Sequence, residues 1–63
     1  MTSLEKLVMM ANQIAANLAH APDPVAATAD HIRLYWDPRM KAMIRGDSVT
    51  GLNDTARAAV QAL

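Results

Sequence analysis

The 63-residue sequence contains no cysteine and no phenylalanine, and it has only two glycines and two aromatic residues, Tyr35 and Trp36. Without cysteine the chain can form no disulfide, and it offers no thiolate to zinc, to an iron–sulfur cluster or to a covalent reaction. Its richest apolar run, Leu7 to Ala11, is far too short for a membrane span or for the apolar region of a signal peptide. We therefore expect a cytoplasmic protein that holds no metal cluster of its own.

The apolar residues that are present are mostly small. Thirteen of them are alanine, as many as leucine, isoleucine and valine together. Alanine is the best helix former but buries little surface. For a chain of this length, burial stabilises the fold by about 90 kcal/mol at ~25 cal/mol/Å², and ordering the residues costs about 95 kcal/mol at ~1.5 kcal/mol each. Because these terms nearly cancel, we expect one small all-helical domain, residues 1–63, that gains stability from a partner.

A capping box at the start of the chain predicts the first helix. Thr2 followed by Glu5 allows each side chain to bond a free backbone N–H of the first turn, so a helix is expected over about 3–19. Its buried face consists of the apolar residues at helical spacing, which are Leu4, Leu7, Val8, Ala11, Ile14, Ala15 and Leu18. This stripe is wide enough to pack against other helices.

The dipeptide Asp23-Pro24 predicts a second helix over 24–36, with aspartate as the N-cap and proline in the first turn. The residues expected on its buried face are Val25, Ala29, Ile32 and Trp36, flanked by Thr28 and Tyr35. Because the connection before this helix is short, the first two helices should form an antiparallel hairpin.

The same pattern recurs at Asp37-Pro38, which predicts a short helix over 38–45 with Gly46 as its C-terminal stop. The expected apolar edge of that helix is Met40, Met43 and Ile44. Residues 46–52 read as a loop. Asn53 or Asp54 then caps a last helix over about 53–63, whose buried face should be Ala56, Ala59, Val60 and Leu63.

Charge and histidine spacing argue against catalysis and against a metal site. The net charge is zero, but residues 33–45 carry four basic side chains and one acidic side chain, a modest positive segment. His20 and His31 would need a third ligand such as Asp23 or Asp30, and their spacing fits no known metal site. Adjacent helical residues point about 100° apart, so Asp30 cannot orient His31 as a catalytic triad requires. We expect no catalytic, cofactor-binding or metal-ligating residue.

Eight residues are candidates for contact with a partner protein. Met9 lies opposite the apolar stripe of the first helix, where a flexible side chain can contact a second protein. Tryptophan and arginine are typical of binding hot spots, although Trp36 more readily fills the core while Arg39 points outward or pairs with Asp30 or Asp37. The candidates are Met9, Asn12, Gln13, Trp36, Asp37, Pro38, Arg39 and Met40.

Three of these segments also carry a family resemblance. The run Leu-Val-Met-Met-Ala-Asn-Gln-Ile-Ala at 7–15, the step His-Ile-Arg at 31–33 and the motif Trp-Asp-Pro-Arg-Met at 36–40 resemble the delta subunit of NAD-dependent, molybdenum-containing formate dehydrogenase. The resemblance covers roughly residues 4–45, with a looser continuation near 51–59. It implies a non-catalytic accessory subunit that binds the catalytic alpha subunit and supports complex stability, assembly or cofactor insertion.

The resemblance also implies where the cofactors of the complex lie. In this family the complex oxidises formate to carbon dioxide and passes electrons to NAD. The alpha subunit is expected to hold the molybdopterin cofactor, and the beta and gamma subunits to hold flavin and further iron–sulfur clusters. Two alternatives from the residues alone stay open: a stand-alone regulatory or nucleic-acid-binding module that uses residues 33–45, and a small helical homodimer.

Overall fold

The computed structural model describes residues 2–63, and in that range four helices and no strand are present. They are α1 (Ser3–Asn17), α2 (Pro24–Tyr35), α3 (Pro38–Ile44) and α4 (Asp54–Gln61). The prediction of an all-helical fold is confirmed, and each predicted helix lies within two residues of the observed one at both ends. No helix in this part of the chain is both long and apolar enough to cross a membrane.

Polar side chains begin all four helices, as the capping pattern predicts. Thr2 and Glu5 form the reciprocal capping box: the Thr2 hydroxyl accepts from the Glu5 N–H at 3.1 Å, and the Glu5 carboxylate accepts from the Thr2 N–H at 3.1 Å. At the other three helices the N-cap oxygen accepts from the N–H three residues later. These bonds join Asp23 to Ala26, Asp37 to Met40, and Asn53 to Ala56, at 3.1, 2.8 and 2.8 Å.

All four helices end one or two residues earlier than expected, and the ends of α1 and α3 show how the backbone stops. Helix α1 stops at Asn17 rather than near Ala19, because the N–H of Ala19 bonds the carbonyl of Ala16 and the last turn tightens. Helix α3 ends with Arg45 as its C-cap, and Gly46 does not take the left-handed conformation of a typical glycine stop. The glycine that needs its freedom is Gly51, whose φ of 91° other residues rarely adopt.

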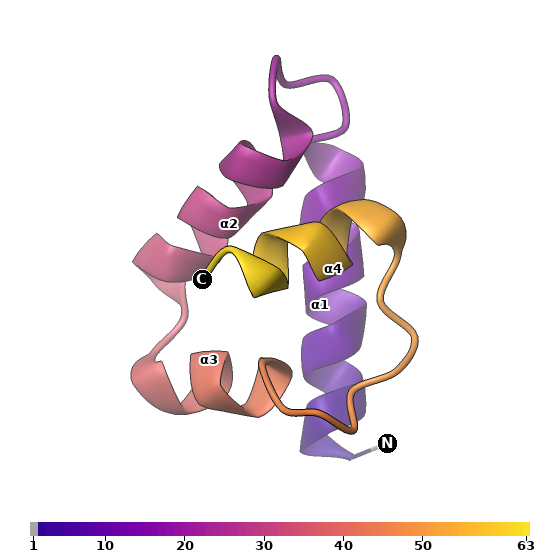
Figure 1. Ribbon diagram of the computed structural model, residues 1–63, viewed down its shortest axis with the longest axis vertical. Coiled ribbons are helices and arrows are strands. Elements are labelled where there is room, and N and C mark those ends of the chain that lie inside the picture. The colour runs from indigo at the N-terminus through magenta and orange to yellow at the C-terminus, as the bar shows by residue number, and fades with distance from the viewer. Residues whose placement is uncertain (1) are drawn as a thin grey trace.

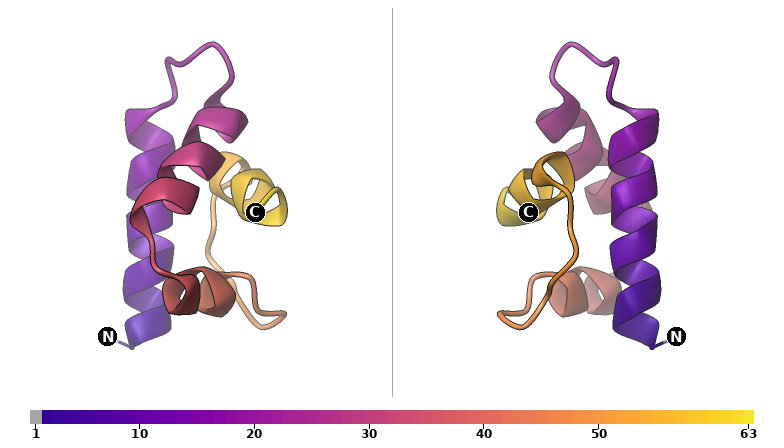
Figure 2. Two further views of the ribbon diagram at one scale, coloured as in Figure 1. Left: turned by 90° about the vertical axis from the view of Figure 1, so that its left-hand side faces the viewer. Right: turned by 90° about the vertical axis from the view of Figure 1, so that its right-hand side faces the viewer.

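The helices enclose the core from several sides. Helices α1 and α2 run in opposite directions, as expected for a hairpin, but they splay apart below the connection that joins them (Figure 1). Helix α4 lies across both, and it packs more extensively on α2 than α1 does. Helix α3 closes the end of the molecule remote from that connection, as both side views show (Figure 2).

The core between these helices is built from small residues and a few large ones. Its buried apolar members are Leu7, Ala11, Ala15, Ile32, Trp36, Ile44, Ala56 and Val60. Leu4, Val8 and Ile14 of the predicted stripe are only partly buried and pack against this core. Thr28 is fully buried, and its hydroxyl has no hydrogen-bond partner among the described residues. The chain exposes 4166 Å², close to the roughly 4,000 Å² expected of a compact chain of this mass.

Candidate partner-binding grooves

One groove on the surface runs between α1 and α2 and ends at α3. It has a volume of about 370 Å³. We call it the methionine–tyrosine groove. Its lining consists of Met10, Gln13, Ile14, His31, Tyr35, Trp36 and Met40. Five of these seven side chains are apolar or aromatic, so the groove offers a surface suited to an apolar ligand or protein segment.

Large apolar side chains are exposed at and beside this groove. Tyr35 is 73% exposed, Met10 is 43% exposed, and Leu34, the neighbour of Tyr35 on α2, is 78% exposed. The ring of Tyr35 is held by a tilted stack on His31, with ring centroids 4.7 Å apart. Trp36 is only 5% exposed and forms part of the rigid wall. The groove therefore combines a buried tryptophan in its wall with exposed methionine and tyrosine side chains at its rim.

Sequence reasoning found part of this groove. Of the candidates, the structure brings together Gln13, Trp36 and Met40 here, and the inward orientation of Trp36 is confirmed. The sequence analysis did not include Met10 among the candidates, and it placed Tyr35 only at the flank of the buried face of the second helix. Helical spacing gave no signal for the exposure of Tyr35, which lies three residues after buried Ile32 and seven after buried Thr28 on α2.

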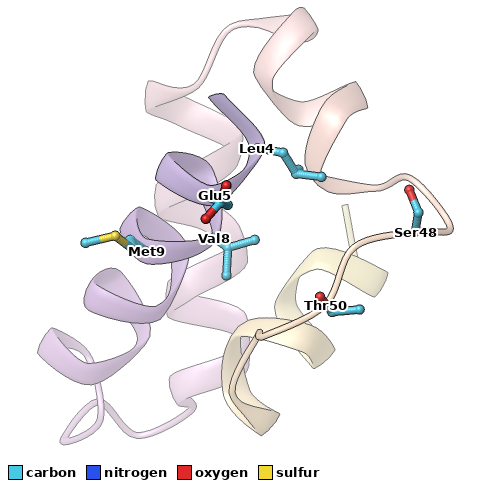
Figure 3. Close-up of a pocket in the computed structure, with 6 residues that line it drawn as sticks. All are labelled: Leu4, Glu5, Val8, Met9, Ser48 and Thr50. Carbon is cyan, nitrogen blue, oxygen red and sulfur yellow. The ribbon is translucent and has the colours of Figure 1, made fainter. Parts of the chain in front are cut away.

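Met9 lies on a different surface, a groove between α1 and the loop that precedes α4. This loop groove has a volume of about 260 Å³ and is lined by Leu4, Glu5, Val8, Met9, Ser48 and Thr50 (Figure 3). Met9 is 56% exposed, as its position opposite the apolar stripe predicts. The hydrogen bonds from the backbone and the side chain of Thr2 lower the pKa of Glu5 below its ordinary value, so this groove carries a carboxylate that stays ionised into more acidic solution than an ordinary glutamate.

The side chain of Asn12 forms hydrogen bonds within the chain, and these bonds hold the loop that precedes α4 against α1. Its amide donates to the carbonyl of Gly51 at 2.9 Å, and its side-chain oxygen accepts from the N–H of Asn53 at 2.8 Å. The Asn53 side chain donates in return to the Asn12 carbonyl at 3.5 Å. Asn12 thus holds both the glycine with positive φ and the residue that caps α4. Sequence spacing could not show this role, because about forty residues separate the partners.

Substitution of Asn12 by alanine is expected to destabilise the fold by about 1–2 kcal/mol, since two hydrogen bonds between distant segments are lost. Urea unfolding followed by far-UV circular dichroism measures this change. Asn17→Ala is the matched control, because Asn17 accepts only one exposed bond, from Gln13 on its own helix. Equal stability of the two variants would show that the Asn12 bonds do not hold the loop.

The remaining candidates lie at the start of α3. The Asp37 carboxylate is the N-cap, and Pro38 occupies the first turn. Arg39 is exposed, and its pairing with Asp30 or Asp37 is not found: Asp30 instead pairs with Arg33 at 2.7 Å. Of the two histidines, His20 is exposed and His31 stacks on Tyr35. Throughout residues 2–63, no three His, Cys, Asp or Glu side chains come together as a metal site.

Fold and surface together define a small all-helical domain with exposed apolar grooves and a fold held by its own helix caps. The family model of the NADH-dependent formate dehydrogenase delta subunit, FdsD, matches residues 6–60. The chain therefore belongs to this family, which confirms the resemblance carried by its Met-Ala-Asn-Gln-Ile and Trp-Asp-Pro-Arg-Met motifs. No curated protein and no solved structure matches the chain.

Proposed function

We propose that this chain is a non-catalytic accessory subunit that binds the catalytic alpha subunit of an NAD-dependent formate dehydrogenase in the cytoplasm. Through this contact it supports the stability of the complex, its assembly or the insertion of its cofactor. The observation that carries the proposal is the methionine–tyrosine groove, on a chain whose family is that of a formate dehydrogenase delta subunit.

The groove has the composition of a protein-binding surface. Tyrosine and methionine are enriched at protein interfaces, because tyrosine combines apolar area with a polar end and methionine adapts its shape to its neighbour. Exposed Tyr35 and Leu34 are adjacent on α2, and Met10 faces the same groove from α1. A partner that covers these side chains removes from water the apolar area that this small chain cannot bury by itself.

The chain's composition supports placing the redox cofactors on other subunits. Iron–sulfur clusters are held by cysteine thiolates, and this sequence has none. In the proposed complex the molybdopterin cofactor lies in the alpha subunit, and flavin, NAD and further clusters lie in the beta and gamma subunits. The role of this chain is then structural: it covers a surface of the alpha subunit and holds that surface in one conformation.

Co-purification tests the proposal. The chain carrying Tyr35→Asp and Met10→Asp is co-expressed with the other subunits, and the amount retained on a tagged alpha subunit is compared with wild type. A charged carboxylate at each rim position must be desolvated on binding, so retention should fall by more than about tenfold. Circular dichroism of each variant confirms that the helices remain.

Met9→Asp is the control for Met10→Asp, because it replaces the neighbouring methionine of α1 by aspartate but lies in the loop groove. It should leave retention within about twofold of wild type if docking uses the methionine–tyrosine groove. Loss of binding by Met9→Asp together with normal binding by Tyr35→Asp would contradict this placement. A complex that assembles and oxidises formate equally well without the chain would contradict the accessory role.

A further inference from the structure

Another groove, formed by the end of α2, one face of α3 and the end of α4, is lined by cations. It has a volume of about 350 Å³, and we call it the basic groove. Its lining consists of Arg33, Pro38, Lys41, Ala42, Arg45 and Leu63. Three of the chain's six lysine and arginine residues therefore lie on this groove, and none of its six acidic residues lines it. The excess of positive charge at residues 33–45 is concentrated here.

Two of these cations are held in place by helix ends. One guanidinium nitrogen of Arg33 donates to Asp30 at 2.7 Å, and the other donates to the carbonyl of Ala62 at the end of α4 at 3.0 Å. The ammonium of Lys41 donates to the carbonyl of Arg33, in the last turn of α2, at 3.2 Å. Cations are favourable at helix C-termini, so both side chains have a stable position in the groove wall.

The third cation has no such partner. The ion pairs found within residues 2–63 are Arg33–Asp30 and Arg57–Asp54, and neither involves Lys41 or Arg45. Lys41 and Arg45 are four residues apart, so their like charges lie one turn apart at the end of α3 and repel each other. Lysine has three donors and arginine has five, and most of those on Lys41 and Arg45 are free within this part of the chain.

We propose that the basic groove binds a carboxylate-bearing segment of the partner protein. A carboxylate seated there supplies the counter-charge that the groove lacks and accepts hydrogen bonds from Arg45 and Lys41. An apolar residue next to it in the partner's sequence packs against Pro38, Ala42 and Leu63. This inference rests on the proposed function, because the partner is the complex to which the chain binds.

The surroundings favour an acidic protein segment over nucleic acid. A nucleic-acid backbone presents a regular row of phosphates and needs a basic face of matching length. Here three basic residues line one groove with an apolar side, and the segment that carries Lys41 and Arg45 is preceded by Asp37 and followed, after Gly46, by Asp47. The basic residues therefore form no continuous face for a phosphate chain, whereas a short protein segment with one carboxylate needs only the groove itself.

The test is binding of the full chain to formate dehydrogenase purified without it, measured from about 50 to about 500 mM salt. Arg45→Glu should bind about tenfold more weakly than wild type at low salt, and the difference should shrink as salt rises. Arg45→Gln should lie between the two. Arg57→Glu is the control with the same change of net charge outside the basic groove, and it should bind within about twofold of wild type.

Three results would overturn the inference. The first is equal low-salt affinity of Arg45→Glu and wild type. In that case, if Tyr35→Asp still abolishes binding, the proposed function stands and only binding through the basic groove is excluded. The second is equal weakening by Arg45→Glu and Arg57→Glu, which would show a general charge effect. The third is binding to a single-stranded oligonucleotide that is tighter than binding to the complex and is lost in Arg45→Glu. Failure of the wild-type chain to bind the complex at all would instead contradict the proposed function.

Discussion

Replacement of Trp36 by alanine is expected to unfold most of the chain. Trp36 is 5% exposed and belongs to the core together with Leu7, Ile32 and Ile44. Truncation of a buried tryptophan to alanine costs about 3–5 kcal/mol, and a core of this size rarely supplies more than about 3–5 kcal/mol of net stability. Far-UV circular dichroism of the purified variant should therefore show loss of most of the helical signal.

The neighbouring aromatic residue provides the control. Tyr35→Ala removes a side chain that is 73% exposed, so the free energy of unfolding should change by less than about 1 kcal/mol. The same variant should bind formate dehydrogenase more weakly if the proposed docking surface is correct. If Trp36→Ala kept its helices and lost only binding, Trp36 would be an interface residue rather than a core residue.

Replacement of Ile32 by aspartate is expected to have a still larger effect on folding. Ile32 is fully buried in the last turn of α2, and no charged side chain is buried among the described residues. Burial of an unpartnered charge, added to the loss of the isoleucine contacts, should cost more than about 4 kcal/mol. The variant should show a random-coil circular dichroism spectrum and should not accumulate with the other subunits in co-expression.

Leu34→Asp tests whether this effect comes from burial. The substitution lies on the same helix, two residues away, but at a side chain that is 78% exposed. Its free energy of unfolding should stay within about 0.5 kcal/mol of wild type. Unfolding of both variants to the same extent would mean that α2 tolerates no acidic residue, and the buried position of Ile32 would not explain the loss.

Local signals in the sequence predict most of the fold. The four N-caps act within three residues of themselves, so Thr2, Asp23 and Asp37 could be assigned without knowledge of the rest of the chain, and the fourth was narrowed to Asn53 or Asp54, of which Asn53 is the cap. The faces of the helices follow from apolar spacing in the same way. For this reason Ala56, Ala59 and Val60 are buried in α4 as predicted, although Leu63, which was predicted with them, lies beyond the helix and is only partly buried.

Contacts between distant segments could not be predicted in this way. The bonds of Asn12 to residues 51–53 depend on the path of a loop, and the closeness of α4 to α2 depends on how three helices share one small core. The same holds for the candidate site. Gln13, Trp36 and Met40 meet in one groove because α1 and α2 splay apart, whereas Met9 lies with the loop instead. Interhelical geometry, which local spacing does not encode, decides which candidates share a surface.

The packing of α4 has a consequence for the order of events during synthesis. Ala56 and Val60 complete the core that contains Ile32 and Trp36, so that core stays open until the ribosome has released α4. Helices α1 and α2 are synthesised about one to five seconds before α4 is complete, at ordinary translation rates of roughly 5–20 residues per second, and during that time they lack this part of the core. Since a helix pair of this size is marginal alone, the chain acquires its grooves only after translation has passed α4.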